Sequence, residues 1–183
     1  MRPHNERLTR LARMSAWLAH ASKIAAVIFL IVNVFMWLVS GVVVDAARSQ
    51  SSLPAPMKIT MTTEATMLAL AVSTAYVALL AVALWSIAKL FTEFSKGAIF
   101  VPETGVYLRR AGLYLLVFAA LAPVFRAMIG VIVTMANPPG ERALSISFSS
   151  HEVILGLIAA LLVMLGHIMA EASDIADDNS RIV

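Results

Sequence analysis

The sequence predicts an all-α integral membrane protein, an antiparallel four-helix transmembrane bundle with an interfacial amphipathic helix at its N-terminus. Hydrophobic residues make up 60% and charged residues 14% of the 183 residues, against about 45–50% and about 25% in an average soluble domain. The mean hydropathy is +0.86, and a chain of this size has too little interior to bury that much apolar surface. We therefore expect much of the apolar surface of this chain to lie in a lipid bilayer.

Four apolar stretches have about the 20 residues that a helix needs to cross the hydrocarbon layer. They are far longer than strands of four to eight residues and lack the alternation of outer-membrane strands. The first is also too long for a signal peptide, so we expect it to stay as an anchor. The predicted spans of this single transmembrane domain, residues 1–183, are residues 24–44, 65–90, 111–136 and 153–170.

The distribution of Lys and Arg predicts the orientation. Of the 14 such residues, ten lie on the side that holds both termini and the connection between the second and third spans. Three lie on the other side, and Arg126 lies inside the third span. Because cytoplasmic segments are enriched in Lys and Arg, both termini are expected in the cytoplasm. The short connections make neighbouring spans antiparallel.

Three segments are expected to form the cytoplasmic face. Residues 2–19 are basic with apolar residues at helical spacing, which predicts a helix on anionic lipid or a docking surface for a partner. Between the second and third spans, Gly97 suits a helix C-cap and Pro102 the first turn of the next helix. The acidic tail is expected to continue the fourth helix with a charged face. The predicted docking residues on these segments are Arg7, Arg10, Arg13, Gly97, Phe100, Glu103, Arg109, Arg110, Glu171, Asp174 and Asp178.

The outer connections and the fourth span carry two further patterns. Asn137-Pro138-Pro139-Gly140 predicts a helix stop, and the alternation of apolar residues with Ser over residues 144–149 predicts an extended segment over the outer mouth of the bundle. Small residues are expected to form close-packed helix contacts, with homo-oligomerisation as the alternative use. They are Ala71 and Ala75 in the second span and Gly156, Ala160, Val163, Gly166 and Ala170 in the fourth.

Several of these short motifs occur together in a known family. The turn at residues 97–100 leading into residues 107–112, the Asn137–Gly140 stop and the ending over residues 166–183 resemble a bacterial family of four-span inner-membrane proteins of unknown function. Genes of that family often neighbour small Cro/C1-type helix-turn-helix regulators. The resemblance implies a bacterial inner-membrane location and a cytoplasmic transcriptional regulator as partner. It implies no catalytic residues.

A polar layer is predicted inside the membrane around Arg126. An arginine within a span costs about 2.5–3.5 kcal/mol on insertion scales, so its charge must be matched or must reach water. One interpretation is a structural lock, in which Arg126 reaches toward Glu64 or Glu152. The other is a cavity that binds an anionic or carbonyl-bearing ligand. The residues expected in this layer are Arg126, Asn33, Ser73, Thr74 and Tyr76.

The remaining patterns argue against catalysis. The chain has no Cys and four His, and no two His lie at one depth on facing spans as a haem would require. A row of His167 and the acidic tail is expected to be a solvated face rather than a metal site, and no nucleotide-binding or hydrolase motif occurs. We therefore expect no cofactor, no metal, no nucleic-acid binding and no enzymatic activity. The predicted function is a regulatory or sensor protein, and the alternative is a structural or accessory subunit of a larger membrane complex.

The orientation yields a direct test. A reporter that is active only in the cytoplasm should be active when fused after Lys96 and inactive when fused after Lys58, because ten cations hold the first site inside. The opposite activities, or a number of passes other than four, would contradict the predicted topology.

Overall fold

Helices are the regular elements of this chain. The computed structural model describes residues 3–39, 41–54, 57–97 and 101–180, and no strand occurs in these ranges. Four of the five helices are long and apolar enough to cross a membrane, which confirms the predicted fold class. The helices are α1 (Pro3–Leu38), α2 (Val43–Gln50), α3 (Thr63–Ser95), α4 (Pro102–Thr134) and α5 (Ser150–Ser180).

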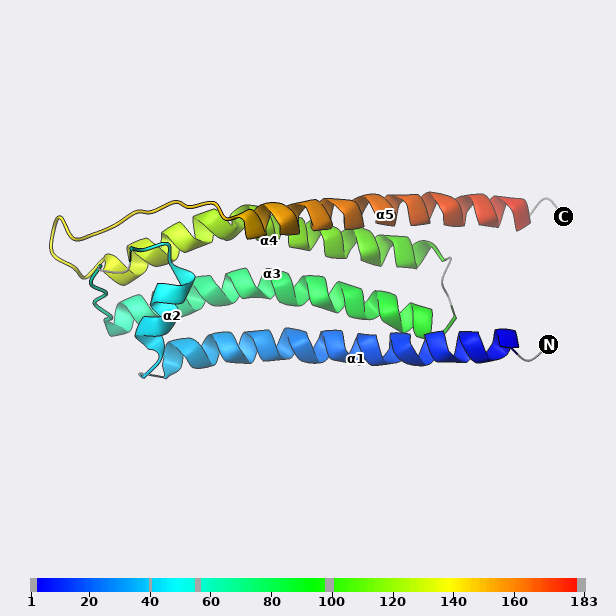
Figure 1. Cartoon of the computed structure of the whole chain (residues 1–183), viewed down its shortest axis with the longest axis horizontal. Coiled ribbons are helices and arrows are strands. Elements are labelled where there is room, and N and C mark those ends of the chain that lie inside the picture. The colour runs from blue at the N-terminus through cyan, green and yellow to red at the C-terminus, as the bar shows by residue number, and fades with distance from the viewer. Residues whose placement is uncertain (1–2, 40, 55–56, 98–100, 181–183) are drawn as a thin grey trace.

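The four long helices lie side by side in chain order, and neighbours run in opposite directions (Figure 1). α3 packs between α1 and α4, and α5 packs against α4. α1 and α5 are therefore the two edges of an open row. The end with both chain termini is called the terminal end below, and the end with α2 and the loop before α5 is called the cap end (Figure 1).

α1 joins the basic N-terminal segment and the first span in one helix of 36 residues. The sequence predicted a separate interfacial helix ahead of the span. No Gly or Pro lies between Pro3 and Leu38 to interrupt the helix, so the basic segment projects along the helix axis. At 1.5 Å per residue, α1 is about 54 Å long, well beyond the roughly 30 Å of the hydrocarbon layer.

The cap end contains a helix that the sequence did not predict. α1 ends at Leu38 rather than at the predicted residue 44, and α2 begins at Val43 and contacts both α1 and α4. It helps to enclose a hydrophobic cluster from four helices. The cluster consists of Trp37, Ala47, Ala69, Phe125, Ile129 and Val133.

The connections follow the turn residues. Gly97, which follows the C-cap residue Lys96 of α3, has φ +84°, and Pro102 stands in the first turn of α4, which confirms both predictions. Phe100 lies outside the described residues. α4 ends at Thr134, two residues before the predicted end of the third span. The side chain of Asn137 then donates hydrogen bonds to the carbonyls of Lys58 (2.8 Å) and Glu141 (3.1 Å), which ties the two loops of the cap end together.

α4 and α5 approach closely through glycines. A Cβ on Gly112 would lie 2.7 Å from the backbone nitrogen of Val163, and a Cβ on Gly166 would lie 2.6 Å from that of Arg109. Such contacts are typical of membrane helices, where dispersion rather than the hydrophobic effect holds the helices together. Of the predicted seam, Gly156 and Ala160 lie outside this contact, and Ala71 and Ala75 of α3 are exposed.

A pair of alanine substitutions tests the close contact. Gly112→Ala should lower the melting temperature of the detergent-solubilised protein by several degrees, because the new methyl group meets backbone atoms that cannot move aside. The control, Gly156→Ala, places its Cβ in open space, and alanine is the better helix former. Its melting temperature should be unchanged or slightly higher, and equal effects at the two sites would contradict the described packing.

Candidate functional site near the cap end

The start of α5 is built by a reciprocal pair of hydrogen bonds. The Ser149 hydroxyl accepts a hydrogen bond from the backbone N–H of His151 (3.1 Å), and the Glu152 carboxylate accepts one from the backbone N–H of Ser149 (2.6 Å). This is the capping box, whose sequence pattern is a Ser followed three residues later by a Glu. That pattern was present in the sequence and predicts the position of Glu152.

Arg126 reaches across from α4 to this cap. Its guanidinium forms an ion pair with Glu152 and donates a hydrogen bond to the carbonyl of Ser147 at 2.9 Å. The side chains of Arg126 and Glu152 are 22% and 10% exposed. The sequence suggested Glu64 or Glu152 as the partner of Arg126. In the structure the partner is Glu152, while Glu64 is exposed on α3. An intrachain partner for the charge favours the structural interpretation of Arg126.

The chain between α4 and α5 returns alongside α4 instead of covering the mouth of the bundle. The backbone N–H of Ala143 donates a hydrogen bond to the Thr134 hydroxyl (3.3 Å). Further along, the hydroxyls of Ser147 and Ser52 are hydrogen-bonded (2.7 Å), and the Ser147 carbonyl accepts the hydrogen bond from Arg126. We call residues 143–149 the strap. Its large apolar side chains, Leu144, Ile146 and Phe148, are exposed, and Phe148 is 79% exposed. The strap is extended, as its alternating pattern predicted, but its position is set by Arg126 and Thr134.

The depth of the ion pair follows from the length of α4. Arg109 and Arg126 are 17 residues apart, which is about 25 Å along a helix. If the cation-rich level of Arg109 marks one boundary of a roughly 30 Å hydrocarbon layer, Arg126 lies close to the other boundary. The ion pair and the strap then stand where the apolar layer ends. Polar backbone outside a helix is tolerated there because protein groups and water can satisfy it.

The other residues of the predicted polar layer form a second, separate group. The Asn33 side chain donates to the hydroxyls of Ser73 and Thr74, both at 3.1 Å, and so joins α1 to α3. Tyr76 lies between the two groups and donates to the carbonyl of Phe118 at 3.0 Å. Its ring stacks on Phe118 and Phe125, with centroids 4.3 and 4.2 Å away. The polar residues therefore join neighbouring helices in pairs rather than around one centre.

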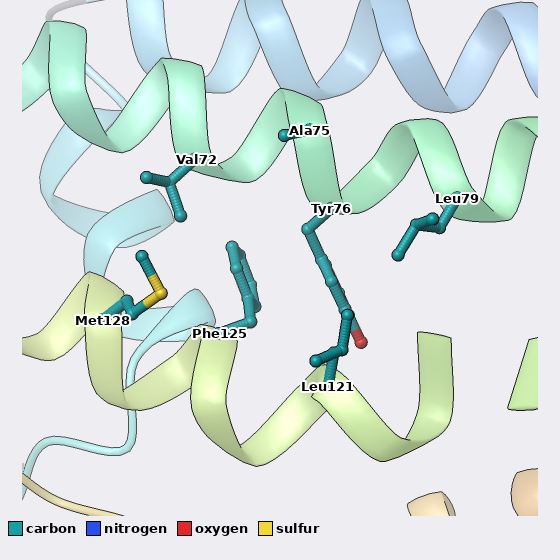
Figure 2. Close-up of a pocket in the computed structure, with 7 residues that line it drawn as sticks. All are labelled: Val72, Ala75, Tyr76, Leu79, Leu121, Phe125 and Met128. Carbon is teal, nitrogen blue, oxygen red and sulfur yellow. The ribbon is translucent and has the colours of Figure 1, made fainter. Parts of the chain in front are cut away.

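An apolar hollow of about 270 Å³ opens between α3 and α4. Tyr76 and Phe125 project into it from the two helices (Figure 2). Its other lining residues are aliphatic or Met, and the Tyr76 hydroxyl is already bonded to Phe118. Sites for polar small molecules need a few converging polar groups. This hollow offers an apolar surface suited to a hydrocarbon chain, and Arg126 is not among its lining residues.

The residues predicted to form the docking surface are spread over the terminal end. Glu103, Arg109 and Arg110 are exposed on the first turns of α4. Arg10 and Arg13 are exposed on α1, and Glu171 on α5. Arg7, Asp174 and Asp178 belong to these helices, but their side chains are outside the description. Within the described residues, no three His, Asp or Glu side chains are grouped to hold a metal ion.

The fold and this site define a multi-pass helical membrane protein. A family model described as "Protein of unknown function (DUF2975)" matches residues 49–183. The chain belongs to this family, and the matched part includes α3, α4, the strap and α5. Searches of curated proteins and of solved structures found no match.

A double-mutant cycle measures the ion pair. Arg126→Leu should destabilise the protein by about 1–3 kcal/mol, because it leaves the Glu152 charge unmatched in a partly buried position. Glu152→Gln should cost a similar amount, and the double variant should cost clearly less than the sum. Unfolding in a denaturing detergent titration measures these values.

Two controls belong to this cycle. Arg110→Leu removes an exposed arginine and should leave stability nearly unchanged. Ser149→Ala removes only the cap and should cost about 1 kcal/mol. Strict additivity of the Arg126 and Glu152 effects would show that the two side chains are not coupled.

Proposed function

We propose that the protein is a non-enzymatic regulatory or sensor protein of a bacterial inner membrane, whose terminal end docks a cytoplasmic protein. The observation that carries this proposal is the difference between the two ends of the molecule. At the cap end, a hydrophobic cluster is buried and a hydrogen bond from Asn137 joins the two loops. At the terminal end, α1 and α5 project past the adjacent ends of α3 and α4 as separate helical arms (Figure 1).

The exposed charges where the two arms begin differ in sign. Where the arms begin, α1 carries the exposed cations Arg10 and Arg13, and α5 carries the exposed acid Glu171. Between the arms, Arg109 and Arg110 of α4 are also exposed. Charged groups on rigid helices support recognition of a partner because they select complementary charge without needing to become ordered first. This supports docking rather than catalysis.

A transcriptional regulator is the partner that we propose for this surface. Its support is the resemblance noted in the sequence, together with the positive-inside rule, from which we expect the cation-rich end on the cytoplasmic side. The open edges of the row favour the second candidate, an accessory subunit that binds other membrane helices through α1 or α5. The two candidates differ in the kind of protein that should be captured.

Affinity purification in mild detergent tests the proposal. The wild-type protein should retain a soluble DNA-binding protein, and Arg109→Ser/Arg110→Ser should lose it at least severalfold, because the substitutions remove two charges from the docking surface. Eight cations would still hold that side inside, so the topology should not change. Lys58→Ser, an exposed cation at the cap end, is the control and should retain the partner.

The captured proteins decide between the candidates. Integral membrane subunits that are unaffected by Arg109→Ser/Arg110→Ser would favour the accessory-subunit function. A soluble partner retained equally by all three proteins would show that this surface is not where it docks.

A further inference from the structure

Within the described residues, each edge helix leaves one face without a long-helix neighbour. On α1, the buried residues Ala19, Ala26 and Asn33 face α3. At 100° per residue, the opposite face carries Arg10, Arg13, Trp17, Ile24, Ile31 and Phe35, all of them exposed. On α5, Ala159 and Gly166 face α4, while the opposite face carries exposed Leu157, Leu161 and Ile168. Lipid alone can cover such apolar faces, so their exposure does not identify a neighbour.

The charges at the ends of these faces are more informative. Contacts across the row set its register: Asn33 bonds Ser73, Tyr76 stacks on Phe118 and Phe125, and Gly166 abuts Arg109. Followed from helix to helix, these contacts put Arg13 of α1 at about the level of Glu171 of α5. In Figure 1, α1 and α5 both extend beyond the ends of α3 and α4 at this end of the row. Within the described part of the chain, neither Arg13 nor Glu171 has an ion-pair partner.

We infer that a second copy of this chain covers the free edge, with α5 of one copy packed against α1 of the next. α1 and α5 run in opposite directions (Figure 1), so this contact continues the antiparallel order of the row with every copy in the same membrane orientation. Arg13 of one copy then lies opposite Glu171 of its neighbour. Such a contact joins two different surfaces, and it closes into a ring when the rotation between copies allows it.

One small residue on α5 fits this contact. Ala160 is exposed and lies outside the contact with α4. In the same register it stands at the level of Ile24 of α1, whose exposed side chain can pack closely on it. Close packing in the membrane and charge pairing beyond it therefore act at one interface.

Cysteine cross-linking in native membranes tests the arrangement, because the chain has no cysteine of its own. Within one copy, α1 and α5 are separated by two helices and so by roughly 25–30 Å, while a disulfide needs Cα atoms closer than about 7 Å. Ile24→Cys/Ala160→Cys should therefore form a ladder of dimers and larger species on mild oxidation. Phe35→Cys/Ala160→Cys, with the two cysteines at different levels, is the control and should form few.

A charge exchange in the Ile24→Cys/Ala160→Cys background identifies the interface further. Arg13→Glu or Glu171→Arg alone should lower the cross-linked fraction about two- to fivefold, the effect expected of an exposed ion pair. The two together should restore it. Since both residues are exposed, these changes should leave the fold intact, and circular dichroism checks this.

The remaining outcomes overturn the inference. A ladder that is absent, or that forms equally with the misaligned control pair, would exclude this interface. Efficient dimers from Ile24→Cys alone or Ala160→Cys alone would indicate a symmetric contact instead. The cysteine pair at Ile24 and Ala160 lies outside the docking residues and the cross-linking needs no cytoplasmic partner, so its failure is distinguishable from failure of the proposed docking function.

Discussion

The hydrocarbon layer offers no water to the peptide backbone, and the rest of this structure depends on that constraint. Every N–H and C=O within the layer must be satisfied inside the chain, which is why the apolar stretches are helices. α5, the helix of the fourth span, begins at Ser150 and does not extend as far toward the cap end as α4. The chain that precedes Ser150 is extended and lies beside α4. Arg126 and Glu152 meet at this point and satisfy the carbonyl of Ser147 and the N–H of Ser149. The ion pair thus allows an extended segment to lie beside α4.

The way in which the helices pack differs between the two ends of the molecule. Toward the terminal end, α4 and α5 meet through glycines, since lipid tails are as apolar as the side chains and only close contact gains energy. At the cap end, large side chains such as Trp37 and Ile129 are fully enclosed. That packing is typical of a protein core in water, where burial of apolar surface is itself favourable. The change from one kind to the other agrees with the placement of Arg126 near the boundary of the apolar layer.

The candidate site shows how far local patterns lead. The Ser-x-x-Glu cap of α5 could have been read from residues 149–152, and Arg126 was identified from its charge alone. The pairing of Arg126 with Glu152 rather than Glu64 depended on which helix lies beside α4, and no local pattern states that. The same applies to Asn33, which bonds Ser73 and Thr74 between α1 and α3 and stays apart from Arg126.

The sequence by itself determined the number of long helices, their antiparallel course and the turn at Gly97 and Pro102, because these follow from hydropathy along the chain and from the backbone preferences of single residues. Only the tertiary structure decided that the helices form an open row, that α1 runs unbroken from Pro3 to Leu38, and that the strap turns back along α4. In lipid, apolar side chains are satisfied on every face of a helix. The pattern of apolar residues along a helix therefore does not predict which face packs against a neighbouring helix. That face is determined by contacts between residues that are distant in the sequence.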